Sequence, residues 1–271
     1  MRTTNLKSGI GRIYIREALQ KAENCFLCYL ENKFEERYLD NYLTYLVMDA
    51  GERRRIIESR GFCNYHFYKM LAFSTKPDSG DGHGMALILE SVTEQVLEDI
   101  KSQRQAESAW SRRPVLHLKK GSRSITASRL LKIVAHLVKC PACSHVSTMM
   151  DVYTSDFLRE ISEESEILEL YDASSGMCVP HYVSSLLIAS KMSGEEFGSA
   201  VERIIDKQIQ LVDRMHTDLI EYIKKQDYHF SKEDRVGTEK TVGESLVRVA
   251  GRRGIDRTLT TILRSEKSDV S

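Results

Sequence analysis

The chain has 271 residues, of which 41% are hydrophobic and 29% charged, as is typical of a globular protein with one large or two medium domains. Lys and Arg together number 39, as do Asp and Glu, so the chain has no net positive charge that would attract nucleic acid or an acidic membrane non-specifically. No run of about eighteen apolar residues occurs, and none follows the basic residues near the amino terminus. We therefore expect a cytoplasmic protein with no membrane span.

The first part of the chain predicts a series of helices. One is expected up to Asn24, and a Cys-x-x-Cys sits at the break before a second helix that runs to about Met48. Asp49 is expected to cap a short third helix, which ends at Gly61 because glycine readily takes the left-handed conformation. A helix carrying a Cys-x-x-His follows, and a long amphipathic helix closes this part.

A second series of helices repeats the first. Pro141 fits a first helical turn, Ser162 is expected to cap the short helix, and Gly176 to end it. The last helix of the series is amphipathic, with apolar residues at Ile205, Ile209, Val212, Met215 and Leu219. No alternating strand pattern occurs, so the predicted fold class is all-α.

The cysteines show that the two series are copies of one module. The first set reads CFLC and CNYH, with Cys25, Cys28, Cys63 and His66, and the second reads CPAC and CVPH, with Cys140, Cys143, Cys178 and His181. All four positions are related by one offset of 115, which also aligns the two glycines. We predict two tandem pseudo-symmetric modules at 12–106 and 127–226, a basic linker at 107–126, and a polar connector with an amphipathic tail at 227–271.

Three cysteines and one histidine per module suit a metal ion. Cysteines kept reduced in the cytoplasm favour metal or redox chemistry over disulfides, and Cys₃His is a common structural zinc set. We expect the two helices between the half-sites of each module to bring them together, giving two zinc ions per chain. The alternative is iron–sulfur clusters, since thiolates with an occasional histidine also hold them. His136 and His145 flank the second Cys-x-x-Cys, but their counterparts, Lys21 and Leu30, are not ligands.

The quoted motifs resemble those of a known family. The segments CFLCYLENKFEERYL, GFCNYHFYKM, GHGMALILE, CPAC and GMCVPH are similar to a family of bacterial and archaeal helical proteins described only as a domain of unknown function. The resemblance spans roughly residues 15 to 225. It implies an all-helical cytosolic protein, carries over the eight ligands with Gly61 and Gly176, and implies no activity.

The leading functional expectation is a non-enzymatic, metal-stabilised scaffold that binds a protein partner. An iron–sulfur electron-transfer or redox-sensing protein is the alternative. Less favoured is alkyl transfer at a zinc-bound thiolate, because four protein ligands leave zinc no open position. Nucleic-acid binding through residues 110–132, which carry seven basic residues and no acidic one, is also less favoured.

Overall fold

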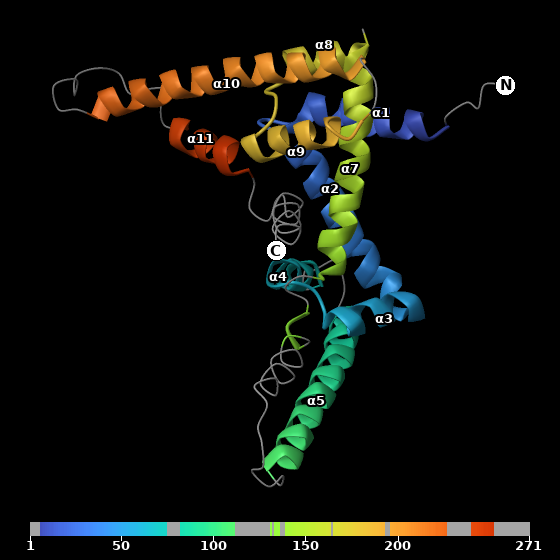
Figure 1. The fold of residues 1–271 in the computed structure, drawn as a ribbon. Helices are drawn as coiled ribbons and strands as arrows, with labels where there is room; N and C mark the ends of the chain where they lie inside the picture. The colour runs from blue at the N-terminus through green and yellow to red at the C-terminus, as the bar shows by residue number, and fades with distance from the viewer. Residues whose placement is uncertain are drawn as a thin grey trace, which may run out of the picture. The chain divides into compact units, whose positions relative to one another are not determined.

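Every regular element that the structure describes is a helix (Figure 1), which confirms the all-α fold class. The computed structural model describes residues 6–74, 82–111, 131, 133–135, 139–163, 165–192, 196–226 and 240–251. Among these residues, no helix combines the length and the apolar character needed to cross a bilayer.

The structure forms two compact units that do not follow the chain in order. Unit one comprises residues 1–34 and 147–271, and unit two comprises residues 35–146. The division falls within two long helices, α2 (Phe26–Thr44) and α7 (Pro141–Ser162). The division of the chain into two tandem copies, a linker and a tail rests on the sequence repeat and stays a prediction.

Unit one has an aromatic core between α2 and α7. Its other helices are α1 (Leu6–Lys21), α8 (Glu166–Ala173), α9 (Val179–Ala189), α10 (Glu196–Gln226) and α11 (Thr241–Ala250). The ring of Phe26 lies 4.7 Å from that of Phe157, and both contact Tyr171 of α8. Phe34 stacks on Tyr153 at 4.4 Å. Because the contacts advance along α2 and retreat along α7, these helices run antiparallel in this unit.

Unit two packs its helices around buried aromatic and aliphatic side chains. Besides parts of α2 and α7, the helices of this unit are the 3₁₀ helix η1 (Leu46–Met48), α3 (Ala50–Ser59), α4 (Asn64–Ser74) and α5 (His83–Ser111). Tyr42 meets Phe62 edge to face at 5.3 Å, with Met70 and Ile88 in the same cluster. This core positions the start of α4, which carries one half of a candidate metal centre.

The helix boundaries confirm some predictions and correct others. Asp49 caps α3 by accepting a 2.9 Å hydrogen bond from the backbone N–H of Glu52, as predicted. α7 begins at Pro141, also as predicted. The predicted cap at Ser162 is wrong: α7 continues through that residue, and the side chain of Ser165 caps α8 instead. The predicted second helix also stops early, since α2 ends at Thr44.

Gly61 and Gly176 both lie in the left-handed region, with φ of 99° and 71°. The predicted helix end at Gly176 is wrong, because α8 already ends at Ala173 with Ser174 as an extended C-cap, and Gly61 follows Arg60, the left-handed C-cap of α3. Each of the two glycines also makes a close approach. A Cβ on Gly61 would lie 2.4 Å from the ring of Phe67, and one on Gly176 would lie 2.3 Å from Leu211. Both glycines are therefore required by the backbone conformation and by the packing around them.

Replacing Gly61 by alanine should destabilise the protein by about 1–3 kcal/mol, since a left-handed residue with a side chain costs about 1–2 kcal/mol before any steric overlap. The matched control is Gly198→Ala in α10, where no atom lies within 4 Å of the added Cβ. That change should stabilise by about 0.5–1 kcal/mol. Urea unfolding followed by circular dichroism measures both, and a Gly61→Ala variant as stable as the wild type would contradict the assignment.

Candidate metal centres

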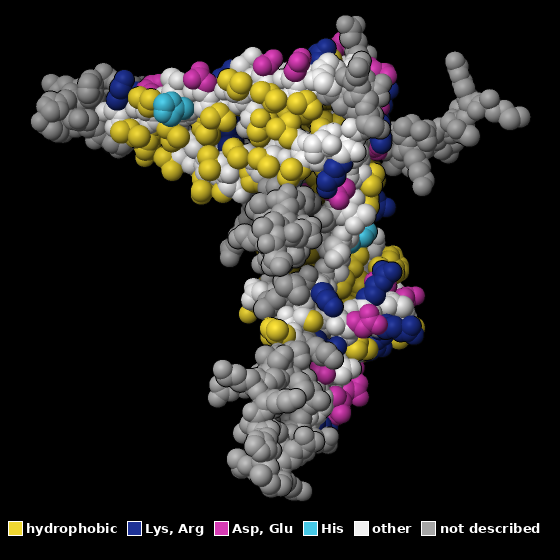
Figure 2. Space-filling model, in the orientation of Figure 1, with side chains coloured by type: hydrophobic (Ala, Val, Ile, Leu, Met, Phe, Trp, Pro, Cys, Tyr) yellow, Lys and Arg dark blue, Asp and Glu magenta, His cyan; other side chains and the backbone are white. Residues whose placement is uncertain are grey.

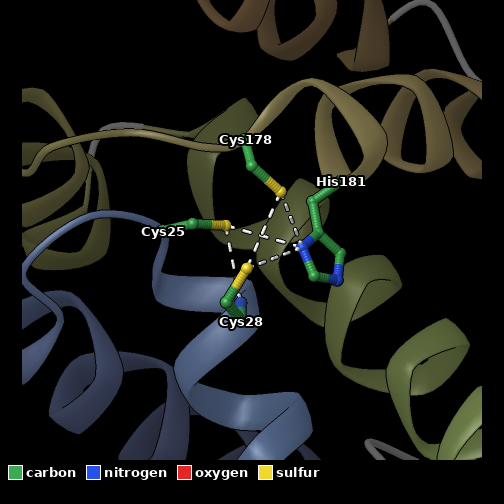
Figure 3. Close-up of side chains that lie close together, drawn as sticks. All are labelled: Cys25, Cys28, Cys178 and His181. Atoms are coloured by element: carbon green, nitrogen blue, oxygen red, sulfur yellow. Dashed lines mark hydrogen bonds between the residues drawn. The ribbon is translucent and has the colours of Figure 1, made fainter. Parts of the chain in front are cut away.

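Each candidate centre combines two helix starts. Cys25 precedes the first residue of α2, and Cys28 lies in its first turn. Likewise Cys178 is the N-cap residue of α9, and His181 lies in the first turn. Residues three apart in a first turn lie on the same side of a helix, so each start presents two ligands together. Figure 3 shows the four side chains converging on one point, and we call this group site one.

Site one is compact and buried. Nδ1 of His181 lies 3.5 Å from Sγ of Cys25, 3.5 Å from Sγ of Cys28 and 3.2 Å from Sγ of Cys178. The sulfurs of Cys28 and Cys178 are 3.7 Å apart. All four residues are buried, so water has little access to the ligand atoms.

Site two has the same construction from the starts of α4 and α7. Nδ1 of His66 lies 3.1 Å from Sγ of Cys63 and 3.4 Å from Sγ of both Cys140 and Cys143. The sulfurs of Cys63 and Cys143 are 3.8 Å apart. Three of the ligands are buried, and Cys143 is partly exposed.

The structure thus brings together all eight residues singled out in the sequence, but their pairing is exchanged. The expectation that each copy closes its own group is wrong. The Cys-x-x-Cys of the first copy meets the Cys-x-x-His of the second in site one, and the reverse holds in site two. The Cys₃His composition of each group is unchanged by the exchange.

Helix lengths favour the exchange. With a rise of about 1.5 Å per residue, the part of α2 from Cys28 to its end at Thr44 carries the chain about 24 Å along the helix axis. The 10 residues of α3 span only about 15 Å, so α3 alone does not offset the length of α2. The second copy repeats the mismatch, with 22 residues in α7 and 8 in α8.

The distances fit one tetrahedral ion at each site. With Zn–S of about 2.3 Å and Zn–N of about 2.0–2.1 Å, a tetrahedron places sulfurs about 3.8 Å apart and sulfur about 3.5 Å from nitrogen. The sulfur separations of 3.7 and 3.8 Å agree, and the sulfur–nitrogen distances fall between 3.1 and 3.5 Å. The eight residues are therefore placed as a single ion in each site requires.

The thiols of site two shift one another's pKa in opposite directions. Hydrogen bonds with Cys140 and Cys143 lower the pKa of Cys63 far below its usual range, whereas those with Cys140 and Cys63 raise the pKa of Cys143 far above it. Burial lowers the pKa of His66, but hydrogen bonds to Cys140 and Cys63 outweigh it and raise the pKa to about 11. Three adjacent thiols cannot all ionise without a cation, and a divalent ion that displaces the protons would remove this conflict.

A carboxylate on α2 lies behind each histidine. Oε1 of buried Glu35 is 2.7 Å from Nε2 of His66, and its other oxygen accepts hydrogen bonds from Tyr65 and Lys69. Oε2 of Glu31 is 3.6 Å from Nε2 of His181. A carboxylate at hydrogen-bond distance, as Glu35 is, fixes the orientation of a metal-binding imidazole. Burial raises the pKa of Glu35, but the hydrogen bonds from His66 and Lys69 outweigh it and lower the pKa overall.

Sequence reasoning missed both carboxylates. The available signal was their position, three and seven residues after Cys28, which places them on the same side of the helix as that ligand. Of the two other histidines considered, His136 lies outside the described residues. His145 stacks on Tyr38 at 4.3 Å and belongs to neither site.

The helices and the two buried groups define an all-helical protein with two Cys₃His sites that could each hold a metal ion. The chain belongs to a family of unknown function (DUF6062), whose model matches residues 6–254. No curated protein and no solved structure matches the chain. The family match confirms the resemblance seen in the sequence, and it adds no activity.

Double substitutions should reveal the exchanged pairing. Cys63→Ser with Cys140→Ser removes two ligands of one site, so this variant should keep one metal equivalent per chain. Cys25→Ser with Cys63→Ser removes one ligand from each site and should bind both ions weakly or not at all. Metal per chain is measured by elemental mass spectrometry after gel filtration. If instead the Cys25→Ser, Cys63→Ser variant kept one metal equivalent and the Cys63→Ser, Cys140→Ser variant kept none, the ligands would be paired within each copy.

Glu35→Gln should weaken metal binding at site two by roughly 10–100-fold, since it removes the anion behind His66. Site one should be unaffected. Competition with a chromophoric zinc chelator resolves the two affinities. Glu36→Gln is the matched control, because Glu36 is the exposed neighbour on the same helix, whereas the carboxylate paired with His66 is that of Glu35. Equal affinities in the two variants would show that Glu35 has no positioning role.

Proposed function

We propose that both sites bind zinc, one ion each, and that the ions stabilise a non-enzymatic helical protein that binds another protein chain. The observation that carries this proposal is the filled tetrahedron: four protein ligands converge at each site with the spacing of a single ion. Three thiolates and one imidazole form a common structural zinc set.

The ligand spacing favours a single ion over an iron–sulfur cluster. In each site the four ligand atoms all lie within 4.8 Å of one another. A cluster distributes its protein ligands over different iron atoms, so they must stand around several metals and bridging sulfides. Zinc also accepts mixed thiolate and imidazole ligands in a tetrahedron without further partners.

Burial supports a structural role for the ions. A catalytic zinc keeps one position open for water or substrate, whereas four protein ligands fill the shell here. Seven of the eight ligand residues are buried, with Cys143 the exception. Because alkyl transfer requires substrate access to a zinc-bound thiolate, this burial favours stabilisation of the fold over that chemistry.

A protein is the partner that the described surface supports. Large apolar side chains are exposed on α10 and α11, as protein-binding surfaces require. The nucleic-acid proposal depended on residues 110–132. Most of that segment lies outside the described residues, and the part described includes the end of α5 at Ser111.

Protein purified without oxygen and without added metal should be colourless and contain two zinc ions per chain by elemental analysis. Removing them with a strong chelator should lower the unfolding temperature sharply, since structural zinc contributes roughly 10–16 kcal/mol and a domain has only about 5–15 kcal/mol of stability. The control is re-addition of zinc, which should restore the transition. If the purified protein contained iron and acid-labile sulfide, the zinc proposal would be wrong and electron transfer or redox sensing would be the supported function.

A further inference from the structure

Helices α10 and α11 of unit one carry an exposed apolar face. Its members are Ile209, Val212, Ile220 and Ile223 on α10 with Val242, Leu246 and Val249 on α11, and their exposed fractions run from 39% to 66%. Figure 2 shows hydrophobic side chains gathered over these helices and α9. The largest apolar patch on a soluble monomer is often functional, so the apolar face is a candidate interaction site.

The exposed positions on α10 are symmetric about His216. Ile209 and Ile223 each stand seven residues from it, and Val212 and Ile220 each stand four residues from it. At about 100° per residue, all four also lie within about 40° of residue 216 around the helix axis. The apolar positions of this stripe therefore have the same spacing from residue 216 toward either end of the helix. The stripe can thus pack against an identical stripe that runs the opposite way.

We infer that the apolar face binds a second copy of the chain, with the two α10 helices antiparallel and crossing at His216. The pairing places Ile209 of one copy near Ile223 of the other, and Val212 near Ile220. Such a two-fold interface is self-complementary, as in most homodimers. The inference rests on the proposed function as a binding protein, for which it names the partner.

Charges beside the stripe match this pairing. Asp206 and Lys224 are both exposed, and both lie about 80° from His216 on the same side of α10. In the antiparallel arrangement, Asp206 of one copy stands about two residues, or about 3 Å, along the axis from Lys224 of the other. The two-fold axis creates this attraction twice, once at each end of the stripe.

Overall charge favours a second copy over an acidic membrane. A membrane-binding amphipathic helix carries an excess of Lys and Arg beside its apolar stripe. The described side chains of α10 instead comprise five acidic and five basic residues. The whole chain has a net charge of +0 at pH 7, so two copies meet without net repulsion.

The area of the apolar face is at the lower limit for a dimer: two copies together would bury about 800 Å². From residue 209 to residue 223, α10 runs about 21 Å, and with α11 packed beside it the face is about 20 Å wide. That gives roughly 400 Å² per copy before side-chain relief is counted, at the level of the largest patches on monomers. Two copies together approach the roughly 1,000 Å² that separates specific interfaces from incidental ones.

The first test measures mass by light scattering and sedimentation on the zinc-loaded full chain. Wild type should have twice the chain mass of 31.0 kDa, and Ile223→Glu should raise the dimer dissociation constant at least about 100-fold, since the charge is buried twice per dimer. Ile13→Glu on α1 is the matched control, because Ile13 and Ile223 are 65% and 66% exposed. It should leave the dimer intact. A monomeric wild type at tens of micromolar would overturn the inference.

The second test exchanges the charges. Asp206→Lys should weaken the dimer by about 2–10-fold, because each Lys224 then faces a like charge. Adding Lys224→Asp should restore wild-type affinity, since the pairs are re-formed with opposite sign. A double variant no stronger than the single one would overturn the antiparallel pairing.

Two further measurements separate this inference from the proposed function. Zinc per chain is determined in every sample, so a monomer that retains two zinc ions contradicts the second copy but not the metal sites. Flotation with phosphatidylserine vesicles is run in parallel. A wild-type chain that is monomeric and floats with the vesicles would assign the apolar face to a membrane and overturn the inference.

Discussion

The joining of a Cys-x-x-Cys from one copy to a Cys-x-x-His from the other is the constraint on which the rest of the structure depends. Site one joins Cys28 to Cys178 across 150 positions, and site two joins His66 to Cys140 across 74. In the chain-entropy treatment of cross-links, loops of these sizes contribute about 5 and about 4.5 kcal/mol, against about 3.8 kcal/mol for the 34 residues between half-sites of one copy. Exchange therefore makes each proposed ion restrain a larger part of the unfolded chain. It also explains why both compact units take residues from either side of the chain's midpoint.

The two sites are chemically alike in their ligands and unlike in what surrounds them. Glu35 contacts the histidine of site two at hydrogen-bond distance, whereas Glu31 stands 3.6 Å from the histidine of site one. The positions 115 residues further on hold Met150 and Val146, which cannot accept a hydrogen bond in the same way. The sequence repeat therefore includes the ligands but not the carboxylates behind the histidines. α2 supplies both carboxylates, one turn apart, but only Glu35 lies at hydrogen-bond distance from a histidine, so it orients the imidazole of site two.

Much of this could be predicted from the sequence, because local rules govern it. The eight ligands, the cap at Asp49 and the helix start at Pro141 follow from motif spacing and from backbone groups that need partners. The ligand pairing could not be read from spacing, because spacing says how many residues separate two half-sites and not where the helices point. The apolar periodicity of α10 likewise predicted a helix. Periodicity does not tell which apolar side chains a neighbouring helix covers, and Ile209, one of the periodic positions, is exposed.

The exchanged pairing also orders events during translation. The ribosome releases the first copy with Cys25, Cys28, Cys63 and His66 already present, yet these four belong to two different sites in the finished fold and do not form a group of their own. Site two becomes complete in ligands when Cys143 emerges, and site one only after His181. Because domains generally form from the amino terminus as the chain grows, the ligands of site two would be assembled before those of site one. A chain cut short before its second Cys-x-x-His would be left with one site that no ion can close.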